Sequence, residues 1–149
     1  MTERPLLIDR DALRAIIARA RRDGPNETCG LLVGKDEHIL EAVEAVNAAA
    51  DPTRNYEIRP EDYFAQIKRC RTINERSGER FAVLGAYHSH PRSAPEPSPT
   101  DLAQAFHDFV YLIVGPAERG GGIEARAYRL GAGNFEPVPL VPVAEEASP

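Results

Sequence analysis

Two stretches of the chain repeat their apolar residues at helical spacing and carry helix signals at both ends. The first runs from Asp9 or Asp11 to about Arg22, and its apolar stripe consists of Leu13, Ile16, Ile17 and Ala20. The second opens on Pro60-Glu61-Asp62 and ends at about Arg76, before Gly78. Its expected buried side consists of Tyr63, Phe64, Ile67, Cys70 and Ile73. Both stretches are predicted to be amphipathic helices.

Short apolar segments rich in Val, Ile and aromatic residues predict strands between and after these helices. Residues 28–33 and 39–46 flank a polar turn, so we expect them to form an antiparallel hairpin. The continuous apolar run 109–114 predicts an interior strand. Three further strands are expected at residues 55–58, 81–87 and 123–130.

Helices that alternate with strands indicate an α/β fold, with a mixed sheet flanked by helices. A chain of 149 residues has the length of one domain, which we place at residues 1–135. Residues 136–149 are rich in Pro, Ala, Val and Glu and are interpreted as a Pro-rich C-terminal tail, extended and frayed at its end.

Composition and charge narrow the classes of function. No window approaches the ~20 apolar residues of a membrane span. Residues 1–5 precede no signal-peptide core, so the expected location is the cytoplasm. The net charge of −5 and the lack of a basic block beyond residues 68–71 argue against nucleic-acid binding. In that compartment Cys29 and Cys70 are expected to be buried thiols rather than a disulfide.

The candidate chemistry lies after the strand at residues 81–87. His88 and His90 are two residues apart at its end and point to the same side, and Asp101 follows in the first turn of a short helix that opens on Ser98-Pro99. Two imidazoles and a carboxylate form a three-point ligand set for Zn²⁺, which leaves the fourth position of a catalytic site for water.

A reading without metal accounts for parts of the same pattern. Ser98 and Asp101 fit a helix capping arrangement, and an acid in a first turn is favourable through the helix dipole. Paired histidines near a strand end are also common on surfaces. The two remaining histidines, His38 in a polar turn and His107 near a helix end, are expected to have solvated surface roles.

The residues around this site resemble the JAMM motif of the MPN metalloprotease family. In that motif a Glu lies far upstream of His-x-His-Pro, followed at fixed spacing by Ser and Asp. This chain has Glu27, then His88-Ser89-His90-Pro91, Ser98 and Asp101. The resemblance covers about residues 6–130 and implies the single-domain MPN (JAMM) fold, a curved mixed β-sheet flanked by helices.

The resemblance also implies a role for each motif residue. His88, His90 and Asp101 would bind Zn²⁺, Glu27 would be the general base and later the general acid, and Ser98 would stabilise the oxyanion. Without the motif, Glu27 would be interpreted as an ordinary surface acid. The resemblance assigns no role to Cys29, for which structural packing is favoured.

The partner that the resemblance implies is a small ubiquitin-like or sulfur-carrier protein with a C-terminal Gly-Gly tail. We expect this tail to add as a strand along an exposed sheet edge near the zinc, where only Gly would pass a narrow channel. The short chain is similar to compact prokaryotic members, one branch of which releases cysteine from a carrier–cysteine adduct. Removal of a ubiquitin-like modifier from lysines, and a non-catalytic MPN interaction scaffold, are the alternatives. Ala86 stands where the family often has Trp, which alters the groove wall. A homodimer is left open.

Overall fold

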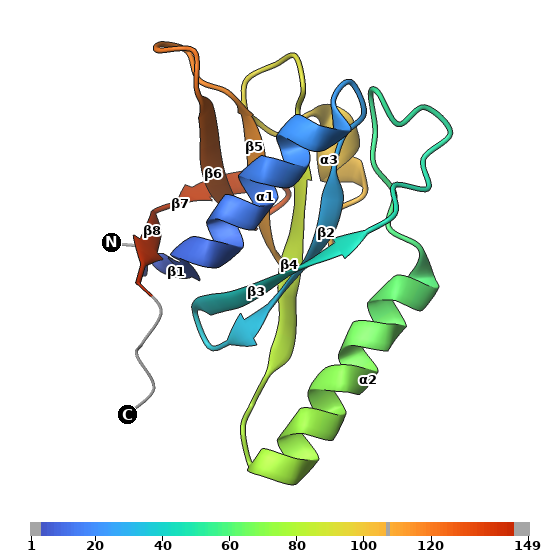
Figure 1. Cartoon of the computed structure of the whole chain (residues 1–149), viewed down its shortest axis with the longest axis vertical. Coiled ribbons are helices and arrows are strands. Elements are labelled where there is room, and N and C mark those ends of the chain that lie inside the picture. Colours follow the sequence, from blue (N-terminus) through green and yellow to red (C-terminus); the bar gives the residue numbers. More distant parts are fainter. Residues whose placement is uncertain (1–3, 107, 145–149) are drawn as a thin grey trace.

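The computed structural model describes residues 4–106 and 108–144, which form three helices and eight strands (Figure 1). In chain order they are β1 (Leu6–Asp9), α1 (Arg10–Asp23), β2 (Cys29–Lys35), β3 (His38–Ala45), α2 (Pro60–Ser77), β4 (Ala82–Ser89), α3 (Pro99–Ala103), β5 (Val110–Pro116), β6 (Ile123–Leu130), β7 (Phe135–Val138) and β8 (Leu140–Val143). The two long helices and the short helix at Pro99 are therefore confirmed, each within one or two residues.

The eight strands form one mixed sheet in the order β7-β6-β5-β4-β2-β3-β1-β8. β4 and β5 are parallel, and β1 is parallel to both of its neighbours, β3 and β8. All other neighbouring pairs are antiparallel, including the predicted β2–β3 hairpin. The apolar strand β5 lies in the interior of the sheet, as predicted, because β4 and β6 pair with its two edges.

Alternating residues of the central strands supply the two sides of the sheet. Leu32 and Tyr87 pack on the side that α1 covers, in the larger core cluster with Ile16 of that helix. Leu31 and Ala86, their chain neighbours, face the opposite side, where they pack with residues such as Tyr63 of α2. Figure 1 shows α1 lying across the sheet and α2 extending away from it beside β4. The sheet therefore separates two apolar layers.

The face of α2 that packs on the sheet is narrower than the apolar stripe predicted from the sequence. Cys70 is 4% exposed and Tyr63 is half-buried, but Phe64 is 65% exposed. The inclusion of Phe64 in the buried stripe was wrong, because α2 meets the sheet only along its Tyr63–Cys70 side. Among the described residues, no helix combines the length and the apolar composition that crossing a bilayer requires.

Residues 55–58 do not form the strand that was expected. Their one ladder contact is an isolated bridge between Ile58 and Asn47. The side chain of Asn47 binds the backbone of both Asn55 and Glu57, so these groups are not free to pair with a strand. This segment is instead a loop fastened by a side-chain amide.

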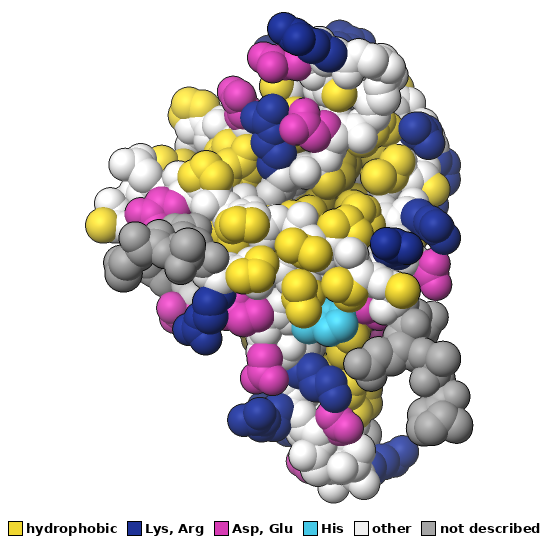
Figure 2. Space-filling view, turned by 90° about the vertical axis from the view of Figure 1, so that its left-hand side faces the viewer, with side chains coloured by type: hydrophobic (Ala, Val, Ile, Leu, Met, Phe, Trp, Pro, Cys, Tyr) yellow, Lys and Arg dark blue, Asp and Glu magenta, His cyan; other side chains and the backbone are white. Residues whose placement is uncertain are grey.

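The two ends of the described chain meet at one edge of the sheet. β1, for which the sequence analysis expected no strand, pairs with β8, whose residues were assigned to the Pro-rich tail. Residues 136–143 complete β7 and form β8, so the expected boundary at residue 135 falls within a strand. Figure 2 shows this side of the molecule, where apolar side chains gather near the middle and charged ones around them. Residues 145–149 of the expected tail lie outside the described residues.

Candidate active site

Three polar atoms from β4, the residue after it and α3 converge on one point. The Nε2 atom of His88, the Nε2 atom of His90 and the Oδ2 atom of Asp101 lie 3.2 Å from one another. Tetrahedral ligands at about 2.0–2.1 Å from a zinc ion are about 3.3–3.4 Å apart. The three atoms therefore have the spacing of one face of a zinc coordination tetrahedron.

The tautomer of His90 suits a metal ligand. Its Nδ1 atom lies 2.9 Å from the carbonyl oxygen of Ala94, so Nδ1 carries a hydrogen, and Nε2 is the atom that presents a lone pair to a metal when the ring is neutral. The loop that supplies this carbonyl packs closely on β5 at Gly115. A Cβ atom at that position would lie 2.6 Å from the carbonyl oxygen of Ser93. Because Nε2 of His90 faces a carboxylate oxygen, a proton or a cation must lie between these two acceptors.

The third group, Asp101, is held by the helix start that carries it. Ser98 caps α3: its Oγ atom accepts from the backbone N–H of Asp101 at 3.0 Å, and its own N–H donates to Oδ2 of Asp101 at 2.8 Å. Burial works to raise the pKa of the Asp101 carboxyl, but hydrogen bonds with His88 and His90 outweigh it and hold this pKa far below its ordinary range. The carboxylate is therefore charged.

His88 is enclosed by protein. It is 1% exposed, and its ring stacks on Tyr56 with centroids 4.2 Å apart and an angle of 17° between the planes. Burial lowers the pKa of His88, which favours the neutral imidazole that binds metals. Its Nδ1 atom is buried without a hydrogen-bond partner among the described residues.

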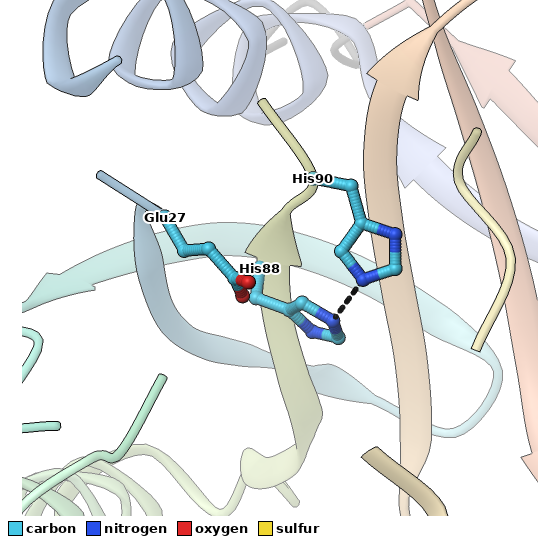
Figure 3. Close-up of side chains that lie close together, drawn as sticks. All are labelled: Glu27, His88 and His90. Carbon is cyan, nitrogen blue, oxygen red and sulfur yellow. Dashed lines mark hydrogen bonds between the residues drawn. The ribbon is translucent and has the colours of Figure 1, made fainter. Parts of the chain in front are cut away.

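Glu27 lies beside the histidines although 60 residues of the chain lie between it and His88. The residue precedes β2, and pairing of β2 with β4 puts Cys29 opposite His88. Ligand atoms of Glu27, His88 and His90 all lie within 4.8 Å of one another, and Figure 3 shows the three side chains converging from the segment before β2 and from the end of β4. The structure thus brings together all the motif residues that the sequence analysis named.

The carboxyl of Glu27 has an unusual environment. Its side chain is buried, with the residue 5% exposed, and Oε1 has no hydrogen-bond partner among the described residues. Burial raises the pKa of Glu27 to about 7, while His90 acts to lower it and Asp101 to raise it. A carboxyl with a pKa near neutrality can both accept and return a proton. Glu27 and the two histidines also form a second candidate ligand set, looser than the one with Asp101.

An apolar pocket of about 530 Å³ adjoins these residues on the α2 side of the sheet. Tyr56, which stacks on His88, forms one wall, and Leu31 and Ala86 lie at the sheet. Phe64 and Phe106 also line it and are 65% and 64% exposed. Sequence analysis missed the role of Tyr56, because its segment was interpreted as a strand rather than as a wall of the site.

Cys29 behaves as a buried structural residue. It is 1% exposed, its Sγ atom lies 3.8 Å from the carbonyl oxygen of Ala45, and burial raises its pKa to about 12. At neutral pH the thiol is protonated, so it is neither a nucleophile nor a thiolate ligand. The preference for packing over chemistry agrees with this environment.

The other two histidines lie outside the site. The expectation of a solvated surface role for His38 was wrong: it belongs to β3, and its Nε2 atom lies 2.7 Å from Oδ1 of the buried Asp9. Asp9 is the N-cap residue of α1, and its carboxylate faces His38 rather than the helix N–H groups. His107 lies outside the described residues.

The site combines a buried acid with two convergent histidines and a carboxylate, and it lies on a mixed sheet flanked by helices. These features place the protein in the class of α/β proteins that can hold a catalytic metal. Residues 9–131 match the family model described as prokaryotic homologs of the JAB domain, and the chain belongs to this family. The resemblance to a compact prokaryotic MPN/JAMM branch and the expected fold are thereby confirmed.

Named relatives agree with this membership. The desampylase of Haloferax volcanii is 36% identical over 126 residues, which cover 80% of this chain and 86% of the relative. The CysO-cysteine peptidase of Mycobacterium tuberculosis is 32% identical over 140 residues, which cover 91% of each chain. A solution structure of a Desulfitobacterium hafniense protein has the same fold, with a TM-score of 0.77 at 22% identity over 93% of each chain.

Proposed function

We propose that this protein is a Zn²⁺-dependent peptidase. It would hydrolyse the amide bond after the C-terminal Gly-Gly tail of a small ubiquitin-like sulfur-carrier protein and release cysteine. One observation carries the proposal: three ligand atoms lie 3.2 Å apart, and close by lies the carboxyl of Glu27, whose Oε1 has no hydrogen-bond partner in the part of the chain that the structure describes. The similarity to a CysO-cysteine peptidase over 91% of the chain supports the substrate class.

In this proposal His88, His90 and Asp101 hold the ion. When bound, Zn²⁺ would lower the pKa of a water molecule and polarise the scissile carbonyl. The ligand set with Asp101 is preferred to the one with Glu27, because its three atoms are closer together and Asp101 is charged. Glu27 is then free for proton transfer.

The remaining steps belong to side chains of this protein. Glu27 accepts a proton from the attacking water and delivers it to the amine that leaves, a role that its pKa of about 7 suits. Ser98 uses its oxygen to accept from the N–H of Asp101, so its hydroxyl hydrogen is available to the oxyanion. The protein excludes water around His88 by stacking Tyr56 on the ring.

A carrier–cysteine adduct and a carrier–lysine adduct, incubated with the zinc-loaded protein and followed by mass spectrometry, test the substrate. The proposal expects free carrier and free cysteine from the first adduct, faster than release from the second. The similarity to a desampylase supports the second candidate, removal of a ubiquitin-like modifier from lysines, which would reverse this order. Cleavage of neither adduct would refute both candidates and favour a non-catalytic scaffold.

Substitution of the acid tests the mechanism. Glu27→Gln should lower kcat by about 10²–10⁴, the usual contribution of a general base, without loss of bound zinc. Glu118→Gln, which removes an exposed carboxyl in the turn after β5, is the matched control and should cleave like the wild type. Wild-type turnover by Glu27→Gln would exclude Glu27 as the proton carrier. We expect only Gly to pass the narrow channel at the metal, so an Ala at the penultimate Gly of the carrier should abolish cleavage, and unaffected turnover would refute the channel.

A further inference from the structure

The backbone of Glu27 is held by a loop rather than by the sheet. Glu27 lies two residues before β2 and so takes no part in the ladder with β3 or β4. Its N–H donates to the carbonyl oxygen of Pro52 at 2.7 Å, and its carbonyl oxygen accepts from Nδ2 of Asn47 at 3.1 Å. Both partners belong to the loop 47–58, which therefore determines where Glu27 sits.

The side-chain amide of Asn47 stabilises this loop with all the hydrogen bonds that it can form. Nδ2 donates to Glu27 and also to the carbonyl oxygen of Asn55 at 2.9 Å. Oδ1 accepts from the N–H of Ala49 at 3.0 Å and from the N–H of Glu57 at 3.1 Å. An asparagine amide has two donor hydrogens and two acceptor lone pairs, so all four are used. This saturation makes Asn47 the link between separate turns of the loop.

The loop also carries the aromatic ring that covers His88. Tyr56 lies between Asn55 and Glu57, the two residues whose backbone Asn47 binds. The Tyr56 ring stacks on His88 at 4.2 Å and is 8% exposed. The side chain of Asn47 therefore binds both the backbone of Glu27 and the backbone on either side of Tyr56, the residue that stacks on His88.

We propose that Asn47 is a positioning residue for catalysis. Its amide sets the distance between the carboxylate of Glu27 and the imidazole of His88 by joining Glu27 to the loop that packs on that ring. This inference rests on the proposed function, in which Glu27 carries the proton. Hydrogen bonds at both backbone groups of Glu27 fix the point from which its buried side chain extends. A displacement of a reacting group by about 1 Å can cost about 100-fold in rate.

The variant Asn47→Asp tests the amide with the least change in shape. It keeps an oxygen for Ala49 and Glu57 but replaces the two donor hydrogens by an oxygen that faces two carbonyls. The expected result is a fall in kcat of about 100-fold, with KM changed less than about threefold. Asn47→Ser is the second variant, used if the aspartate prevents folding, and it should lower kcat in the same way.

The matched control is Asp51→Ala in the same loop. Oδ1 of Asp51 accepts from the N–H and from the hydroxyl of Thr53, and it has no recorded contact with Glu27. This substitution removes only side-chain hydrogen bonds of an exposed turn and keeps the backbone carbonyl of Pro52 that binds Glu27, so kcat should stay at the wild-type value. A merely structural role for Asn47 would lower the melting temperature of its variants with kcat unchanged, and that result overturns the proposal. An equal loss of kcat in Asp51→Ala overturns it as well.

Hydrogen exchange at the amide of Glu27 gives a readout that does not need turnover. This N–H donates to Pro52, so it should be protected in the wild type and in Asp51→Ala, with and without zinc. In Asn47→Asp its exchange should be at least tenfold faster. Unchanged protection overturns the proposal. If the wild type cleaves no adduct, the proposed function fails, and the exchange comparison still decides whether Asn47 holds Glu27.

Discussion

Replacing Glu27 by Gln should make the metal-free protein more stable at neutral pH than the wild type. Burial raises the pKa of Glu27 from 4.5 to about 7, so the folded state opposes its ionisation. Below pH 4.5 the carboxyl is protonated in both folded and unfolded chains and has no pH-dependent effect. Between pH 4.5 and 7 the unfolded chain ionises first, so the wild type loses stability as the pH rises.

The size of this loss follows from the two pKa values. Each tenfold change in an ionisation constant is worth about 1.4 kcal/mol, so the separation from 4.5 to about 7 limits the loss to about 3 kcal/mol above pH 7. Glutamine has nearly the same shape and does not ionise. The free energy of unfolding of Glu27→Gln minus that of the wild type should therefore rise by up to about 3 kcal/mol from pH 4.5 to pH 8.

Urea unfolding of chelator-treated protein at several pH values between 4.5 and 8 measures this difference. Glu57→Gln, at an exposed carboxyl, is the control and should give a difference that does not vary by more than about 0.5 kcal/mol. A flat difference for Glu27→Gln would refute the reasoning, because it would mean that burial does not disfavour the charged carboxylate. A difference that falls with pH would refute it too.

Three further predictions concern the ligands, the pocket and the thiols. Asp101→Asn should weaken Zn²⁺ binding by more than about 100-fold in competition with a chromophoric chelator, because the charged ligand is lost; wild-type affinity would contradict its assignment. Phe64→Ser and Phe106→Ser should each raise KM for the carrier up to about tenfold, with little effect on kcat or on melting temperature, because both rings are mostly exposed at the apolar pocket. A tenfold change corresponds to about 1.4 kcal/mol of lost apolar contact. A fall in kcat at constant KM would contradict this prediction. Cys29 should react with a thiol reagent at pH 8 only as fast as the protein unfolds, because burial raises its pKa to about 12; fast labelling in native buffer would show otherwise.

The parts of the fold that sequence patterns predicted are those that local interactions dictate. The stripe with Ile16 identifies α1, the Ser98-Pro99 start identifies α3, and two apolar segments around a turn identify the β2–β3 hairpin. In each case the periodicity or the cap lies within a few residues of chain. Such signals depend on backbone geometry that neighbouring residues share, so they can be read without knowing the rest of the molecule.

The errors occur where distant residues decide the outcome. β1 and β8 are only four residues each and pair with one another across the chain, so neither has a strand pattern of its own. Residues 55–58 have the composition of a strand, but the amide of Asn47 takes their backbone groups. Phe64 has helical spacing with Ile67, yet α2 covers too little of the sheet to bury it.

By itself the sequence specified which side chains could form a metal site: the spacing of His88, His90 and Asp101 and the resemblance of Glu27 to a family glutamate. Only the tertiary structure decided that their ligand atoms meet at 3.2 Å and that Glu27 lies beside them with a raised pKa. It also decided that Asn47 binds the backbone of Glu27 and that Tyr56 stacks on His88. The physical reason is that distance and burial depend on which strands pair. Pairing of β2 with β4 puts Cys29 opposite His88, 59 positions along the chain, a contact that no local pattern encodes.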